Sequence, residues 1–320
     1  MSNNQFKGCL LGLAIGDAFG APVEFLQLHG IKAKYGEAGI QDLDGWRGFP
    51  AGAYTDDTQM ALATARGCVR AWEAQVTANS DRVDALVYEE YLNWLKTQYD
   101  PHERRAPGNT CLGALRSGRM GTIEDAINNS KGCGGVMRTA PAGLAFKGKR
   151  AFEMGARFAA MTHSHPSGYL SAGFLAEMIA WIIDGRSLED SIESGKKTLK
   201  GYSGHEETLR AVEQAVELAA TADAPMDVIP RLGEGWVGEE ALAISLYCAL
   251  KLSDDYRGGI AAAVNHSGDS DSTGSITGAI LGAKLGVEAI PEKWIARLEN
   301  GSMISELAQS MNSCFGAKRS

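Results

Sequence analysis

Two segments of the chain carry a glycine at every fourth position, and this spacing constrains the fold more than any other feature. The runs are Gly8, Gly12, Gly16 and Gly20, and Gly274, Gly278, Gly282 and Gly286. On a helix this spacing puts the glycines on one slowly turning face, although each costs about 1 kcal/mol relative to alanine. Ordinary core packing would explain either run alone. Two runs indicate close backbone approach, and both adjoin carboxylates: Glu24 follows the first, and Asp269 and Asp271 precede the second.

Helical periodicity recurs through most of the sequence, and no convincing alternation typical of strands is present. The predicted helices cover residues 5–20, 58–72, 82–98, 123–129, 150–161, 168–183, 188–197, 205–220, 239–252, 255–265, 273–285 and 292–299. Short joints rich in Gly, Pro or Asn separate them, and none is long enough for a domain boundary. We therefore expect one all-α domain over residues 1–320, in which residues 28–52 form a helix-free loop or flap.

Charge and cysteine usage exclude several classes of function. The formal charge of −8 leaves no basic face for nucleic-acid phosphates. No apolar run approaches the ~20 residues of a membrane span, and no signal peptide is recognisable. The six cysteines are scattered without a C-x-x-C pair, as expected of reduced thiols. We expect a cytoplasmic protein that binds neither nucleic acid nor membrane.

The strongest local signal is Thr55-Asp56-Asp57-Thr58, which lies directly before an apolar helix. Such residues are typical helix caps, because their oxygens accept free N–H groups. Capping needs one of them, and here four consecutive residues supply oxygen donors. Adjacent carboxylates repel each other unless a positive group lies between them. The segment therefore indicates either a cap or a cation site.

A second acidic segment, residues 266–273, also precedes a predicted helix and contains Asp269 and Asp271. It resembles the start of a calcium loop, but the glycine and terminal glutamate of an EF-hand are missing, so we reject that reading. No Cys/His cluster has zinc spacing. Oxygen-only ligands favour Mg²⁺ or Mn²⁺. Whether the two acidic segments meet is left open by the sequence alone.

Three motifs together resemble the ADP-ribosylglycohydrolase family. They are G-D-A-F-G-A-P-V-E-F (16–25), Y-T-D-D-T-Q-M (54–60) and N-H-S-G-D-S-D-S-T-G (265–274). The likeness runs from about residue 6 to residue 286, with the motifs in family order. It implies a compact orthogonal bundle of helices with a binuclear Mg²⁺ or Mn²⁺ cleft, and a hydrolase that cleaves ADP-ribose from an acceptor.

The resemblance also implies roles for individual residues. The implied metal ligands are Thr55, Asp56, Asp57, Asp269, Asp271 and Ser272. Glu24, Asp56 and Asp57 would act at the reacting bond, with Glu24 as an acid/base or a switchable ligand in a flap. Without the resemblance, Glu24 would be interpreted as an ordinary surface acid.

Further stretches match the family's substrate contacts. The implied binding residues are Asn109, Gly132, Gly134, Gly135, Val136, Met137, His163 and Trp236. A glycine-rich backbone lets several N–H groups converge on a diphosphate, although a double glycine by itself indicates only a turn. His163 could equally be a capping or core histidine, and Trp236 a core tryptophan.

Acceptor and partner are less constrained. Some bacterial relatives carry an aspartate before the G-N-T motif, whereas this chain has Pro107 before Gly108. Only a folded-back loop would bring Asp100 or Glu103 to replace it. Arginine on protein is the expected acceptor, with serine or O-acetyl-ADP-ribose as alternatives. A rival function is neutralisation of a partner ADP-ribosyltransferase by occlusion. A structural role, as in the crystallin relatives, conflicts with the intact ligand positions.

Overall fold

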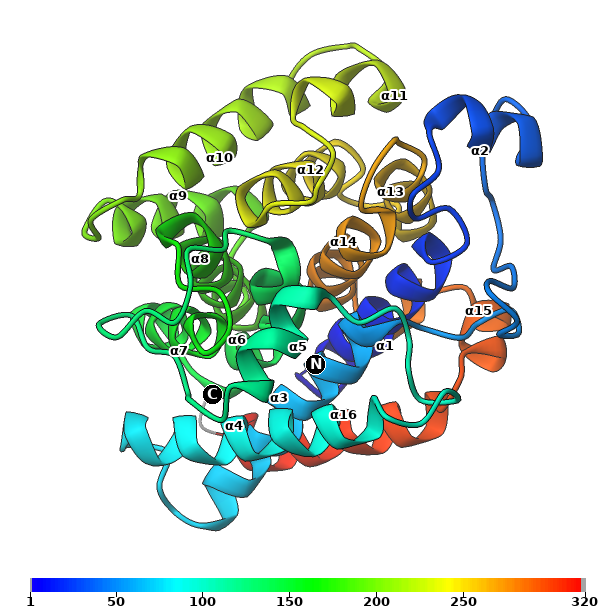
Figure 1. Cartoon of the computed structure of the whole chain (residues 1–320). Helices are drawn as coiled ribbons and strands as arrows, with labels where there is room; N and C mark the ends of the chain where they lie inside the picture. The colour runs from blue at the N-terminus through cyan, green and yellow to red at the C-terminus, as the bar shows by residue number, and fades with distance from the viewer. Residues whose placement is uncertain (1, 318–320) are drawn as a thin grey trace.

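The computed structural model describes residues 2–317, and its secondary structure is helical (Figure 1). Within that range the chain forms sixteen α-helices, three short 3-10 helices and no strand. Only isolated bridges join Trp46 to Phe49 and Gly132 to Val237. The all-α class is thus confirmed. The predicted single domain includes Met1 and residues 318–320, which lie outside the described residues, and its unity stays a prediction.

The helices follow one another along the whole chain. Their bounds are α1 Ser2–Gly20, α2 Leu28–Tyr35, α3 Asp56–Glu73, α4 Ser80–Thr97, α5 Asn109–Arg116, η1 Cys133–Arg138, α6 Ala140–Ala145, α7 Gly148–Ala160, α8 Pro166–Ile183, α9 Leu188–Leu199, α10 Glu206–Ala219, α11 Pro225–Val228, η2 Ile229–Arg231, α12 Gly238–Lys251, α13 Tyr256–Val264, α14 Ser270–Leu285, η3 Val287–Ala289, α15 Glu292–Arg297 and α16 Gly301–Phe315. No helix among these residues is both long and apolar enough to cross a bilayer.

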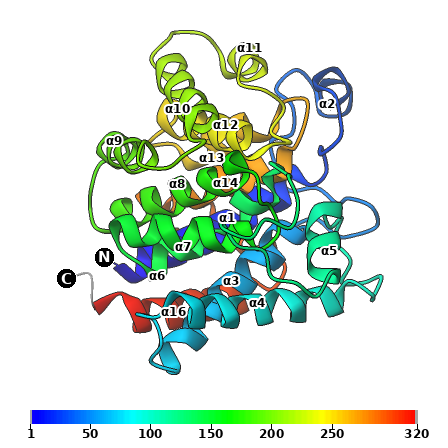
Figure 2. The ribbon, with the colours of Figure 1, turned by 60° about the vertical axis from the view of Figure 1, so that its left-hand side comes forward.

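Helices α1, α14, α7 and α8 form the middle of the molecule. Figure 2 shows α3, α4 and α16 on one side of them and α9, α10 and α12 on the other. Helices α8 and α14 are buried along nearly their whole length. Helix α8 is apolar on nearly all sides, as expected of a helix inside a protein, whereas α14 also buries polar residues in its first two turns.

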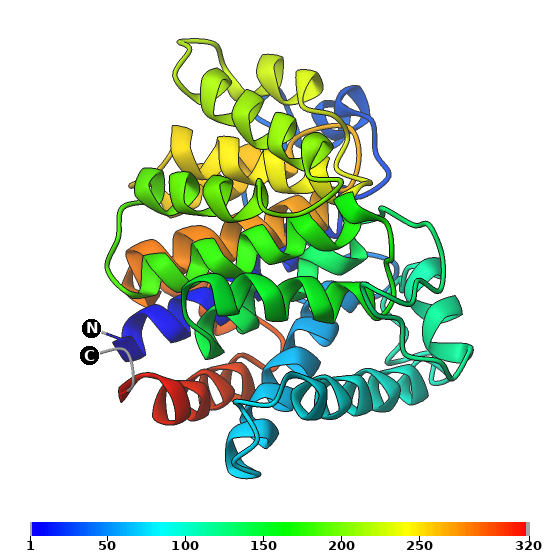
Figure 3. The same ribbon diagram turned by 90° about the vertical axis from the view of Figure 1, so that its left-hand side faces the viewer.

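The two glycine runs pack against each other. Helices α1 and α14 lie side by side and antiparallel, as the blue and orange ribbons of Figure 3 show. A Cβ atom on Gly16 would lie 2.0 Å from the carbonyl oxygen of Gly274, and one on Gly8 would lie 2.2 Å from that of Gly282. Gly20 meets the carbonyl of Ser270 in the same way. The expected close backbone approach is confirmed, and it places the end of α1 beside the start of α14.

Two predictions about local structure are wrong. Residues 123–129 form a loop, because side chains there satisfy the backbone in place of a helix. Asn128 Oδ1 accepts from the N–H groups of Ser130 and Ser164, and the Ser164 hydroxyl accepts from Ile127 N. Residues 28–52 are not helix-free, since α2 lies within them and buries Ile31.

The other predicted helices coincide with helices of the structure, but seven further elements were missed: α5, η1, α6, α11, η2, η3 and α16. The C-terminal helix α16 had a clear signal. It buries Ile304, Ala308, Met311 and Phe315, which recur every three or four residues. Helices α5 and α6, with eight and six residues, are too short for a periodic pattern to be distinctive.

Candidate active site

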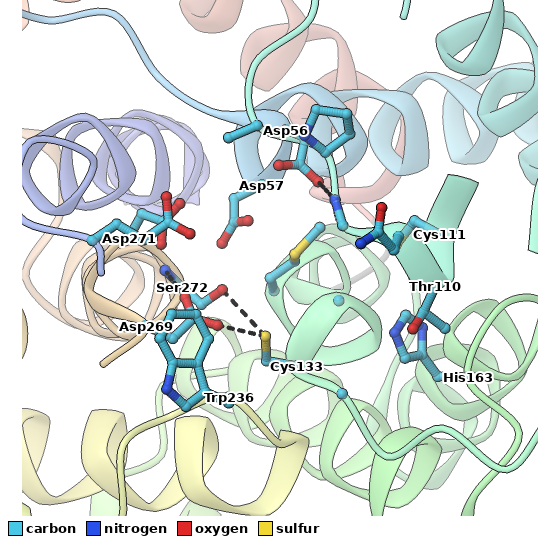
Figure 4. A pocket seen from close by; sticks show the side chains of 18 of the residues that line it. Asp56, Asp57, Thr110, Cys111, Cys133, His163, Trp236, Asp269, Asp271 and Ser272 are labelled. Carbon is cyan, nitrogen blue, oxygen red and sulfur yellow. Dashed lines mark hydrogen bonds between the residues drawn. The ribbon is translucent and has the colours of Figure 1, made fainter. Parts of the chain in front are cut away.

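One pocket collects most of the residues that the sequence singles out (Figure 4). Its volume is about 310 Å³, at the lower end of the range for small-molecule sites. The predicted residues that line it are Glu24, Asp56, Asp57, Asn109, Gly132, Gly134, Met137, His163, Trp236, Asp269, Asp271 and Ser272. The two acidic segments therefore meet, although 212 residues separate Asp57 from Asp269.

Three of the predicted residues do not line the pocket. Thr55 is fully buried, and its hydroxyl caps α3 by accepting the N–H of Asp57 at 3.2 Å. Gly135 packs against Ala159 and the carbonyl of Gly168. Val136 is part of the hydrophobic core. Gly135 and Val136 thus support the loop that carries Gly132 and Gly134.

Helix starts place the carboxylates. Asp56 and Asp57 are the first two residues of α3, and Asp269 caps α14 by accepting the N–H of Ser272 at 3.3 Å. Both segments therefore cap a helix and also bring their carboxylates to the same pocket. The positive ends of the two helix dipoles face these acids. We call Asp56, Asp57, Asp269 and Asp271 the acidic wall.

A further acid, Asp17 in α1, supports the acidic wall from behind. It is fully buried and accepts hydrogen bonds from Thr55 N at 2.9 Å, Thr58 N at 2.9 Å and the Thr58 hydroxyl at 2.6 Å. Burial raises the pKa of Asp17 to about 6, against the lowering effect of these bonds. The sequence alone does not predict a role for Asp17 in the site, because a single acid in an apolar helix forms no recognisable motif.

The carboxylates of the acidic wall are buried close together, and the described residues do not balance all of their charge. Burial, and next the charge of Asp17, raise the pKa values of Asp56 and Asp57 well above the usual range. Burial and the charge of Glu24 do the same for Asp271. Among residues 2–317, Asp57 Oδ2 and Asp271 Oδ1 have no hydrogen-bond partner although both are buried. A buried carboxylate oxygen without a partner is costly, and either protonation or a nearby positive group relieves that cost.

The chemistry of these donors fits a hard divalent cation. All of them are carboxylate or hydroxyl oxygens, the ligands that Mg²⁺ and Mn²⁺ prefer. In the described part of the chain, however, no group of three or more His, Cys, Asp or Glu side chains is arranged to hold an ion as it stands. The donor atoms are thus of the right type for such a cation, but the carboxylates would have to turn toward one another to hold it.

Glu24 lies at the pocket just after α1. Burial raises its pKa to about 9, with further contributions from the charges of Asp269 and Asp56, while Arg47 acts in the opposite direction. The next residue, Phe25, is 56% exposed and has a φ of +66°. Its ring stacks on Trp236 with centroids 5.2 Å apart. Trp236 is therefore a half-buried part of the pocket rim and not a core tryptophan.

The pocket is also lined by Gly132, Gly134 and His163, which we call the donor wall. Figure 4 shows His163 on the side of the pocket away from Asp269 and Asp271. A Cβ atom on Gly134 would lie 2.8 Å from Cε1 of the His163 ring, so only glycine leaves room for this ring. Burial, and next the charge of Arg138, lower the pKa of His163 to about 3. The imidazole is therefore neutral at physiological pH.

Cys133 is a pocket residue that the sequence analysis did not select. Its thiol donates to Asp269 Oδ2 at 2.7 Å and accepts from the Ser272 hydroxyl at 3.6 Å. Asp269 thus has a partner that is not a cation. Cys133 was not predicted from the sequence because a thiol is not a preferred ligand of a hard cation.

The stretch before α5 supplies no acid to the pocket. From this stretch the pocket is lined by Ala106, Pro107 and Gly108, and from the start of α5 by Asn109, Thr110 and Cys111. Of the described residues, Asp100 and Glu103 are not in the lining. Arg105 instead supports Asp56, because its carbonyl accepts the Asp56 N–H at 3.0 Å. The Arg105 side chain pairs with Glu299 at 2.8 Å.

The fold is all-helical and its pocket, between helix starts, is rich in carboxylates. Comparison with known families identifies the class of protein. The family model described as ADP-ribosylglycohydrolase matches residues 2–319. The chain therefore belongs to the ADP-ribosylglycohydrolase family, and it is a hydrolase that acts on glycosidic bonds of ADP-ribose.

Individual relatives agree with this assignment. The chain is 29% identical to the ADP-ribosyl-[dinitrogen reductase] glycohydrolase of Rhodospirillum rubrum, over 93% of this chain and 91% of that protein. It is 28% identical to the ADP-ribosylarginine hydrolase Tri1 of Serratia proteamaculans, over 97% and 79%. A solved structure titled "ADP-ribosylglycohydrolase-related protein complex" superposes with a TM-score of 0.75 at 25% identity, covering 98% of each chain.

Proposed function

We propose that this protein is a divalent-metal-dependent hydrolase that releases ADP-ribose from ADP-ribosylated arginine on proteins. The observation that carries the proposal is the convergence of the acidic wall on one pocket, with buried oxygens of Asp57 and Asp271 that have no partner within residues 2–317. The choice of arginine rests on the likeness to a protein named ADP-ribosylarginine hydrolase.

The site would hold two divalent cations, either Mg²⁺ or Mn²⁺. Asp56, Asp57, Asp269, Asp271 and Ser272 would hold these cations, since the oxygens of these side chains face the pocket. Thr55 would join them only if its hydroxyl left the α3 cap. Bound divalent ions polarise sugar and water oxygens and stabilise the charge that develops during cleavage.

The side chains supply the proton transfers. Burial is the largest cause of the raised pKa of Glu24, and it persists when a cation neutralises the acidic wall, so we assign Glu24 as the acid. It gives its proton to the nitrogen of the leaving guanidine as the C1″–N bond breaks. Water adds its oxygen to C1″, and a carboxylate of Asp56 or Asp57 accepts the proton that the water loses. Two carboxyl groups around an oxocarbenium-like centre are the general arrangement for glycoside cleavage.

The rest of the pocket matches the remainder of an ADP-ribosyl group. The donor wall suits the diphosphate, because a glycine-rich backbone and a neutral histidine offer N–H donors without adding an acid. Trp236 at the rim suits the nucleoside end. The substrate would be an ADP-ribosylated protein or a small ADP-ribose conjugate. We place the protein in the cytoplasm, where its six unpaired thiols, all within residues 2–317, would stay reduced.

The test measures ADP-ribose release from arginine-linked, serine-linked and O-acetyl substrates, with Mg²⁺, with Mn²⁺ and with EDTA. We expect release from the arginine conjugate that EDTA and Asp57→Asn abolish. Asp190→Asn is the matched control, because Asp190 also lies in a first helical turn but is exposed. Release that persists in EDTA would contradict metal dependence, and release from the serine conjugate alone would contradict the arginine acceptor.

The occlusion function makes a separate prediction. If the protein neutralises a partner ADP-ribosyltransferase by covering its active site, Asp57→Asn would protect cells from that transferase as well as the wild type does. We expect the variant to lose protection, because we attribute protection to hydrolysis.

A further inference from the structure

Three buried side chains stand in a row behind the donor wall. Arg138, at the end of η1, is fully buried. Its Nη2 atom donates to the Thr162 hydroxyl at 2.7 Å and to the carbonyl of Phe158 at 2.9 Å. The Thr162 oxygen lies 2.8 Å from Nδ1 of His163. The row therefore ends at the histidine that lines the pocket.

The donors and acceptors in this row favour one arrangement of hydrogens. A guanidinium has donors only, so the Thr162 oxygen is the acceptor of its bond with Arg138. The hydroxyl keeps its own hydrogen, and the groups that can accept it are His163 Nδ1, 2.8 Å away, and the Cys111 sulfur, which is the weaker acceptor. A neutral imidazole that accepts at Nδ1 carries its hydrogen on Nε2.

The ring edge that bears this hydrogen faces the loop that carries Gly132 and Gly134. A Cβ atom on Gly132 would lie 3.3 Å from His163 Nε2, and one on Gly134 would lie 3.1 Å from it. Gly132, Gly134 and His163 all line the pocket. Figure 4 shows His163 across the pocket from Asp269 and Asp271.

We infer that Arg138 and Thr162 are positioning residues, which fix His163 as the neutral tautomer with its hydrogen on Nε2. The pocket then offers a fixed N–H donor to an oxyanion of the substrate beside the glycine loop. The identity of that oxyanion as the ADP-ribosyl diphosphate rests on the proposed function. The opposite tautomer would direct a lone pair at the same oxyanion and repel it.

The first measurement needs no variant. Long-range ¹H–¹⁵N correlation spectra of the labelled full-length protein report which ring nitrogen of each histidine carries hydrogen. His163→Gln identifies the His163 signals among the six histidines. We expect hydrogen on Nε2 and a bare Nδ1. Hydrogen on Nδ1, or on both nitrogens, at neutral pH would overturn the inference.

The second measurement uses a matched pair of variants, with ADP-ribose as the probe. Thr162→Val keeps the side-chain shape but cannot donate to Nδ1, whereas Thr162→Ser keeps the hydroxyl. We expect Thr162→Val to populate the Nδ1–H tautomer and to weaken ADP-ribose binding roughly 10-fold, with KM raised more than kcat is lowered. Thr162→Ser should resemble the wild type.

The outcomes separate this inference from the proposed function. Unchanged tautomer and affinity in Thr162→Val would overturn the positioning role while leaving the hydrolase intact. Failure of wild-type protein to bind ADP-ribose would overturn the proposed function and the role of the Nε2 donor together.

Discussion

The acidic wall and the donor wall line the same pocket, and they are built in opposite ways. On the acidic wall, burial and next the neighbouring charges raise the pKa values of Asp57 and Asp271, and each of these two residues keeps an oxygen without a partner in residues 2–317. On the donor wall, His163 is neutral and the protein itself satisfies its inner nitrogen through Thr162. The difference teaches that the protein itself completes the donor wall but leaves oxygens of the acidic wall without a partner, which is where we propose that a cation binds.

Removing a carboxylate should have the largest effect. We expect Asp57→Asn to lower kcat by at least about 100-fold, because electrostatic stabilisation of the reacting centre is the largest single contribution to most enzymatic rates. His163→Gln should mainly raise KM, since His163 lies on the donor wall. Steady-state kinetics on the arginine conjugate would measure both variants. Equal losses of kcat in the two would break the distinction between the walls.

The glycine packing that brings Glu24 to the acidic wall can be tested by one methyl group. In Gly16→Ala the new Cβ would lie 2.0 Å from the Gly274 carbonyl oxygen, and a backbone atom there cannot move aside freely. Overpacking of this kind should cost about 1–3 kcal/mol of unfolding free energy.

Gly113→Ala is the control for this substitution. Gly113 also lies in a helix, and a Cβ atom added to it would meet no described atom within 4 Å beyond its own helix and chain neighbours. The substitution should stabilise the protein by about 0.5–1 kcal/mol. Urea denaturation measures both variants, and a neutral Gly16→Ala would refute the close-packing account.

Glu24, beside the acidic wall, and His163, on the donor wall, should also differ in how pH affects their contributions to stability. The pKa of Glu24 is raised from 4.5 to about 9 in the folded protein, so the folded state binds more protons than the unfolded state between those values. Stability in EDTA should therefore fall as pH rises from 7 to 9.

The donor wall should contribute nothing in that interval. The pKa of His163 is lowered from 6.5 to about 3, so its contribution is lost only as pH falls below 6.5. Thermal melts of the wild type and of His163→Gln, in EDTA and in saturating Mn²⁺, test this contrast. Mn²⁺ should flatten the slope above pH 7, and a slope that is the same with and without Mn²⁺ would argue against a cation on the acidic wall.

The smallest effect is expected at Cys133, which donates to Asp269. Cys133→Ser keeps a donor and should change Mn²⁺ affinity only slightly. Cys133→Ala removes it and should weaken Mn²⁺ binding by about 10-fold, at the lower end of the usual effect of such supporting groups. Calorimetric titration would compare the two. Identical affinities would mean that the thiol does not orient Asp269.

The sequence predicted the parts of this site that lie in short contiguous patterns. Asp56 and Asp57 are adjacent, and Asp269 and Asp271 precede a glycine run, so short acidic motifs were enough to predict these carboxylates as site residues. Asp17 and Cys133 act only through tertiary contacts, and a single acid or thiol carries no local signal of such a role.

The fold shows the same limit. The glycine runs indicated close helix packing, but only the structure shows that α1 and α14 are each other's partner. The helix predicted at residues 123–129 is absent because the Asn128 and Ser164 side chains bond to the backbone of that loop. That competition depends on Ser164, which is distant in sequence.

The most direct test of the account is calorimetric titration of Mn²⁺ into the metal-free wild type, Asp57→Asn and Asp190→Asn. The account predicts binding to the wild type and to Asp190→Asn with a stoichiometry of about two, the pair that the family resemblance implies, and a loss of binding in Asp57→Asn. Absence of Mn²⁺ and Mg²⁺ binding to a wild-type protein that still releases ADP-ribose in EDTA would contradict it.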